Sequence, residues 1–178
     1  PADEVETREV LAWSVGYEVR AFTLRHVGIP VLPPGSAPVK VLHLSDIHMT
    51  PGQRKKQAWI RDLATLEPDL VVNTGDNLAH RDSVPVVLDA FGALLDVPGV
   101  FVPGSNDYFS PVVKNPLRYL FPDDGSRVTW SPRLPWDKLR AGLEERGWVD
   151  LTNRRARLRV RDVDIAFGES RGRLTGIP

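Results

Sequence analysis

Short apolar runs alternate with longer amphipathic segments through the middle of the chain. The apolar runs predict strands, and the segments between them, with apolar residues at helical spacing, predict helices. The expected elements are strands at 39–45, 69–74 and 99–102 and helices near 53–66 and 84–96. This β-α-β-α-β order requires right-handed crossovers and a parallel sheet covered by helices. Asp82 or Ser83 is expected to cap the second helix, and Pro85 suits its first turn.

The flanking parts are patterned differently. Residues 17–25 alternate between apolar and polar, which predicts an edge strand, and the prolines that follow predict an extended connector, so residues 1–38 form one region. The compact unit is expected to run over 39–178, with a long loop at 103–135. The elements expected after that loop are a helix near 136–146 and strands near 148–151, 155–160 and 163–167.

Composition narrows the functional classes. The 23 basic residues balance the 23 acidic ones, so there is no nucleic-acid signal, and the absence of cysteine excludes thiolate metal sites. No apolar run approaches the roughly 18 residues that span a bilayer. The chain as given is therefore expected to be soluble. It begins with Pro1 rather than Met, so an anchoring segment could precede it, and its localisation is otherwise unknown.

Metal-ligand chemistry follows two neighbouring strands. Asp46 and His48 follow the first, and Asp76 follows the second. Carboxyl ends of parallel strands meet at one edge of a sheet, and side chains two apart in an extended segment share a face, so these groups are expected to converge. Asp76 could bridge to a second cation about 3.5 to 4 Å away, as in two-metal hydrolases. Such ligands suit Mn, Fe or Zn. The structural alternative is helix capping by Asp46 and an ordinary polar His48.

These motifs resemble those of the calcineurin-like metallophosphoesterase superfamily. Its Asp-x-His and Gly-Asp motifs stand here as Asp46-Ile47-His48 and Gly75-Asp76-Asn77, over a resemblance that covers residues 39 to 110. It implies an α/β fold, here part of an αββα sandwich whose mixed sheet has a β-α-β-α-β start. It also implies two divalent metal ions and a metal-bound hydroxide that attacks phosphorus.

The third motif departs from the family pattern. Where the family has Gly-Asn-His-Asp/Glu, this chain has Gly104-Ser105-Asn106-Asp107. Either Asn106 or Ser105 would be the metal ligand, and the resemblance implies catalytic roles for Asn106 and Asp107. Asn106 can donate a hydrogen bond but cannot transfer a proton at neutral pH. Hydrolysis of esters with poor leaving groups is therefore in question.

The family's last two motifs supply three histidines, and after His80 this chain has none. The resemblance therefore implies that the C-terminal motifs are absent and that a C-terminal half or a partner segment completes the site. One hypothesis is a metal-dependent hydrolase of phosphoester bonds. The other is a catalytically incomplete or inactive member that retains the fold and weak metal binding.

Two further residues are candidates for contact with substrate. Arg54 could meet a phosphate, and His80 lies four residues after Asp76. The alternative interpretations are that Arg54 lies in a solvated first turn of a helix and that His80 is an exposed loop residue. The substrate would be a phosphomonoester, a phosphodiester or a pyrophosphate, with lipid-linked compounds among the alternatives. The stretches 16–19 and 42–48 also resemble bacterial phosphoesterases that carry a hydrophobic segment before the catalytic domain.

Overall fold

The computed structural model describes residues 22–110 and 132–168. The chain divides into two compact units, Pro1–Ser36 and Ala37–Pro178. In the first unit, residues 22–30 carry no regular secondary structure. The edge strand expected at 17–25 falls mostly outside the described residues, and its described part is not a strand. Within the described ranges, no helix is long and apolar enough to cross a bilayer.

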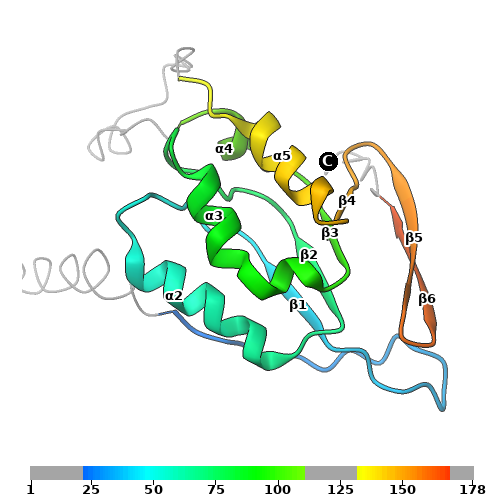
Figure 1. The fold of residues 1–178 in the computed structure, drawn as a ribbon. Helices are drawn as coiled ribbons and strands as arrows, with labels where there is room; N and C mark the ends of the chain where they lie inside the picture. The colour runs from blue at the N-terminus through cyan, green and yellow to red at the C-terminus, as the bar shows by residue number, and fades with distance from the viewer. Residues whose placement is uncertain (1–21, 111–131, 169–178) are drawn as a thin grey trace, which may run out of the picture. The chain divides into compact units, whose positions relative to one another are not determined.

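The second unit is built on a parallel sheet of four short strands (Figure 1). Its strands, in spatial order, are β1 (Val41–Leu44), β2 (Leu70–Asn73), β3 (Gly99–Phe101) and β4 (Val149–Asp150). The α/β class and the β-α-β-α-β start are confirmed. The last residues of the four strands occupy one register row, Leu44, Asn73, Phe101 and Asp150. The loops that follow the strands therefore all leave the sheet at the same level.

The crossover helices pack side by side in the order α2, α3, α5 (Figure 1). They are α2 (Arg54–Asp62), α3 (Val84–Phe91) and α5 (Trp136–Glu145), and the first two continue as the 3-10 helices η2 (Leu63–Leu66) and η3 (Gly92–Asp96). Pro85 lies in the first turn of α3, as predicted. Ser83 holds the N-cap position of α3 but makes no side-chain cap.

The strand β3 packs closely against Trp148. A Cβ atom at Gly99 would overlap the Trp148 indole ring, so glycine permits the contact. The indole nitrogen donates to the Val97 carbonyl at 3.1 Å, and its ring stacks on Phe91 with a centroid separation of 5.7 Å. This contact fixes the start of β3 against α3, and so fixes where β3 ends.

The strands β5 (Arg155–Val160) and β6 (Val163–Gly168) form a separate antiparallel hairpin. Exposed and half-buried positions alternate along both strands, except at Val160, the last residue of β5, which is buried. Arg161, in the turn, forms an ion pair with Asp69 at 2.6 Å, just before β2. The described residues thus contain parallel and antiparallel strands in two sheets.

Candidate metal centre

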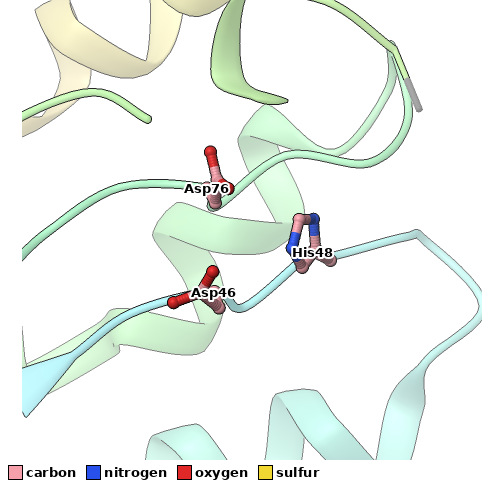
Figure 2. A group of neighbouring side chains, drawn as sticks. All are labelled: Asp46, His48 and Asp76. Carbon is pink, nitrogen blue, oxygen red and sulfur yellow. The ribbon is translucent and has the colours of Figure 1, made fainter. Parts of the chain in front are cut away.

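Asp46, His48 and Asp76 converge at the carboxyl ends of β1 and β2 (Figure 2). One ligand atom from each lies within 4.8 Å of the other two. Ligands around one transition-metal ion are separated by at most about 4.4 Å, twice a typical metal–oxygen bond, so shifts of a few tenths of an ångström would accommodate a cation. Asp46 is exposed and the other two side chains are half-buried. The predicted convergence of these three residues is confirmed.

The backbone at Asp46 and His48 is not extended, so the expectation that these two side chains share a face of an extended segment was wrong. The strand β1 ends at Leu44, and Asp46, His48 and Asp76 have left-handed φ values of 53°, 44° and 56°. Only a few per cent of non-glycine residues adopt this region, with Asp and His enriched among them. Strained backbone of this kind clusters at ligand clamps and active sites. All three candidate ligands are held in it.

Backbone hydrogen bonds join the first loop (residues 45–49) to the second loop (residues 74–78). The N–H of Asp46 donates to the Gly75 carbonyl at 3.0 Å, and the N–H of His48 donates to the Asp76 carbonyl at 2.9 Å. The Met49 N–H then donates to the Asn77 carbonyl at 2.7 Å. The parallel pairing of β1 with β2 therefore continues past the strand ends, which sets the two candidate ligand loops at one fixed separation.

Glycines bring the third loop (residues 102–108) against the second. A Cβ atom at Gly75 would overlap the Gly104 backbone, and one at Gly104 would overlap the Asp76 carboxylate. Gly75 also has a φ of 92°, which L side chains rarely adopt. The short helix α4 (Ser105–Tyr108) follows Gly104 directly. The close approach presents the start of α4 to the Asp76 side chain.

Asp107 holds the second and third loops together from inside the protein. It is fully buried, and its carboxylate accepts four backbone N–H groups, from Gly104, Asp76, Asn77 and Leu78, at 2.7–3.0 Å. Burial raises the pKa of Asp107, against the effect of these four hydrogen bonds. These four bonds go to backbone, and the Asn77 side-chain amide donates a longer one at 3.4 Å, so the placement of Asp107 favours a positioning role. The catalytic role expected for Asp107 stays a prediction.

Asn106, and not Ser105, lies against the candidate ligands. The Asn106 backbone N–H donates to Asp76 Oδ1 at 2.9 Å, and its side-chain Nδ2 donates to Asp76 Oδ2 at 2.8 Å. A carboxylate has about four acceptor positions, so Asp76 keeps lone pairs for a cation. Ser105 is exposed, and its hydroxyl makes no hydrogen bond with a described residue. The arrangement favours Asn106 over Ser105 as the further ligand.

Two buried asparagines that the sequence analysis missed support the second loop. Asn73 Nδ2 donates to Asn77 Oδ1 at 2.8 Å, and Asn73 Oδ1 accepts the Gly75 N–H at 2.9 Å. Both side chains are 1% exposed. An asparagine at the end of an otherwise apolar run was the available signal, because a buried amide must find partners.

Lys56 and Ser83 were also missed as supports of the first loop. Lys56 Nζ donates to the Ile47 carbonyl at 2.7 Å, and Ser83 Oγ donates to the Met49 carbonyl at 2.6 Å. Burial lowers the pKa of Lys56. The two carbonyls lie on either side of His48.

The two predicted substrate contacts lie on the surface. Arg54 is exposed at the start of α2. His80 is exposed, and its Nδ1 accepts the Asp82 N–H at 3.1 Å, which fixes a local turn. Neither belongs to the three-residue cluster. Their contact with substrate stays a prediction.

Comparison with known proteins adds the family. The model of the calcineurin-like phosphoesterase family matches residues 39–169, about three quarters of the chain. The chain belongs to this family. The match extends past residue 110, where the expected resemblance ended, and includes the β5–β6 hairpin.

A transmembrane protein with a metallophosphoesterase domain from Bos taurus is 35% identical over 99 residues. The alignment covers 53% of this chain and 22% of that protein, so the chain spans about a fifth of its relative's length. No solved structure matches. The family is usually metal-dependent, and the cluster of Asp46, His48 and Asp76 gives this member a candidate metal site.

Proposed function

We propose that this chain supplies the first part of the catalytic centre of a metal-dependent phosphoester hydrolase. The observation that carries the proposal is the convergence of Asp46, His48 and Asp76 from two strand ends. Their mixed oxygen and imidazole donors fit a borderline divalent cation such as Mn, Fe or Zn. Asp76 is proposed to bridge two such ions, with Asn106 serving the second.

The residues of the chain have separate tasks in this proposal. Asp46, His48 and Asp76 bind the ions, which when bound would neutralise phosphate charge and activate water. Asn106 orients the Asp76 carboxylate through its two hydrogen bonds and can donate to a phosphate oxygen. Asp107 positions the loops through its four backbone contacts. Protein donors that are fixed before substrate arrives need no reorganisation during reaction.

The family supports a phosphomonoester, a phosphodiester or a pyrophosphate as substrate, and we include lipid-linked phosphates among these. The Bos taurus relative is described as a transmembrane protein. On that description we propose that the whole protein associates with a membrane. A segment beyond this chain, or a partner, would supply the remaining metal ligands.

A second candidate is a member that binds metal weakly and has no turnover. The observation that favours it is Asn106, which occupies the place of the family's histidine and uses its amide nitrogen to hold Asp76. An amide cannot protonate a leaving group at neutral pH. The sequence also has no histidine after His80.

Metal content after Mn loading and desalting tests both candidates, together with hydrolysis of an activated aryl phosphate. The variants are Asp46→Ala and, as a matched control, Asp62→Ala, an exposed carboxylate at the end of α2. In the protein that carries the remaining metal ligands we expect about two ions, lost only in Asp46→Ala, and turnover. One weakly held ion without turnover would favour the second candidate. No ion in the unmodified chain would reject the metal centre.

A further inference from the structure

His48 lies between two backbone carbonyls that are each held by a side chain from elsewhere in the sequence. The Ile47 carbonyl accepts from Lys56 in α2, and the Met49 carbonyl accepts from Ser83, which precedes α3. The backbone of His48 itself is left-handed, with φ of 44°. Lys56 of α2 therefore fixes the peptide group before this strained residue, and Ser83 fixes the peptide group that follows Met49.

The Lys56 contact is specific within its own helix. Lys55 and Lys56 are neighbours in the first turn of α2, yet Lys55 is exposed and Lys56 is half-buried. An ammonium group gives up water to be buried, and a charge-assisted hydrogen bond offsets that loss. The Ile47 side chain is 7% exposed in the core, so its residue is anchored through both its side chain and its carbonyl.

The Ser83 contact replaces the usual task of a residue at its position. A serine at an N-cap ordinarily accepts a hydrogen bond from the first turn of its own helix. Ser83 makes no such bond; its fully buried hydroxyl donates to the Met49 carbonyl. That carbonyl also accepts the Ala79 N–H at 3.0 Å, so Ser83 shares the task with the residue that follows the second loop.

We infer that Lys56 and Ser83 are positioning residues that hold His48 in its ligand conformation before any cation binds. The inference rests on the proposed metal centre for its purpose, although the two hydrogen bonds exist without metal. A metal-binding residue whose backbone is fixed in advance loses less conformational freedom when the cation binds. The affinity for the cation should therefore depend on the hydrogen bonds from Lys56 and Ser83. Lys56 is predicted to matter more, because Met49 keeps a second donor when Ser83 is removed.

The experiment compares Lys56→Met, Lys56→Arg and Ser83→Ala with Lys55→Met as the matched control. The first measurement is residue-by-residue amide hydrogen exchange of His48 and Met49 in the metal-free chain. The second is Mn affinity, with the visible absorption spectrum of the Co-loaded chain as a signature of ligand geometry. We expect Lys56→Met to speed exchange and weaken Mn binding, each about tenfold, the scale of one hydrogen bond to a charged group.

Lys56→Arg, which keeps the charge and the donors, should retain wild-type exchange and affinity. Ser83→Ala should show about a threefold effect in both measurements, again the scale of one shared hydrogen bond, and Lys55→Met none. Unchanged exchange and affinity in Lys56→Met would overturn the inference. Tighter Mn binding in Lys56→Met would also overturn the inference. Repulsion between the Lys56 ammonium group and the cation would then outweigh the benefit of the hydrogen bond to Ile47. If Lys56→Met does not fold, Ser83→Ala decides by the same two measurements.

Failure of the proposed function has a different outcome. If the unmodified chain binds no Mn, the metal centre is rejected, and the positioning role is rejected with it. If the unmodified chain binds Mn and Lys56→Met binds it equally well, only the positioning role is rejected. The Mn titration of the unmodified chain therefore separates the two failures.

Discussion

The metal centre and the β5–β6 hairpin are stabilised in opposite ways. The hairpin has regular strands of six residues each, paired through their own backbone ladder, with one surface ion pair to Asp69. The centre is irregular backbone, and besides the backbone bonds between its first two loops it depends on single side chains, most of all Asp107. Irregular backbone depends on single side chains, whereas a ladder distributes its hydrogen bonds. Substitutions should therefore be costly at the centre and mild at the hairpin.

Asp107→Ala should give the largest loss of stability. It leaves four backbone N–H groups without their acceptor, and an unsatisfied buried group costs about 1–3 kcal/mol. We expect the free energy of unfolding to fall by about 4 kcal/mol or more, measured by urea denaturation followed by circular dichroism. Asp62→Ala serves as the exposed control. A loss below about 1 kcal/mol would remove the contrast between the two regions.

Asp76→Asn should have the next largest effect, on metal binding. Its carboxylate is a candidate ligand and also accepts two hydrogen bonds from Asn106. An amide at this position would carry no charge, and its NH2 group would face one of the two Asn106 donors. We expect Mn affinity to fall about 100-fold, or ~2.7 kcal/mol. Asp107→Asn, which changes a carboxylate outside the cluster, should weaken Mn binding less in the folded chain. Equal effects in an Mn titration would contradict the bridging assignment.

The sequence predicted the frame of this centre well. Apolar runs located β1, β2 and β3, and the rule that parallel strands end at one edge brought Asp46, His48 and Asp76 together. Periodicity carries this information because strand and helix burial repeat regularly along the chain.

The sequence did not predict how the loops are held. A lysine in the first turn of a helix is typical of a solvated face, and nothing local distinguishes Lys56 from Lys55. The carbonyls of the two residues that flank the left-handed His48 accept hydrogen bonds from Lys56 of α2 and from Ser83. Contacts between residues far apart in sequence have no local pattern, so these supports had to come from the structure. Most of the loop expected at 103–135 lies outside the described residues.

Gly104→Ala should lower the stability of the protein by disturbing the contact between the second and third loops of the centre. The added methyl group would overlap the Asp76 carboxylate and force the second and third loops apart. Overpacking of this kind costs about 1–3 kcal/mol. The matched control is Gly52→Ala, because a Cβ atom there has nothing within 4 Å. Thermal unfolding of both variants gives the comparison, and equal midpoints would mean that the loops tolerate separation.

Asp69→Asn should have the smallest effect and tests the hairpin side. Burial raises the pKa of Asp69, but hydrogen bonds from the Lys40 backbone and from Arg161 outweigh it, so the pKa of this carboxyl lies below its usual range. A carboxylate with a lowered folded pKa stabilises above its unfolded pKa, and that contribution is lost as pH falls through the folded pKa. Arg161 is about half exposed, so we expect about 1 kcal/mol or less at neutral pH.

The measurement for Asp69→Asn is the free energy of unfolding as a function of pH. The variant should show a flatter profile than the unmodified chain at and below about pH 4, where an unfolded aspartate titrates. Identical profiles in the two proteins would show that the ion pair between Asp69 and Arg161 does not contribute. Strand pairing and the Arg159–Asp164 ion pair would then be the contacts that hold the hairpin together.

Met49 gives the centre a built-in spectroscopic probe. It is the only methionine among the 178 residues, it follows His48 directly, and it is fully buried in parallel pairing with Leu78. Selective carbon-13 labelling of its methyl group would give one resonance from one known place beside the candidate ligands. Paramagnetic Mn or Co bound there would broaden or shift that resonance, so a single peak could report metal occupancy without an assignment of the whole spectrum.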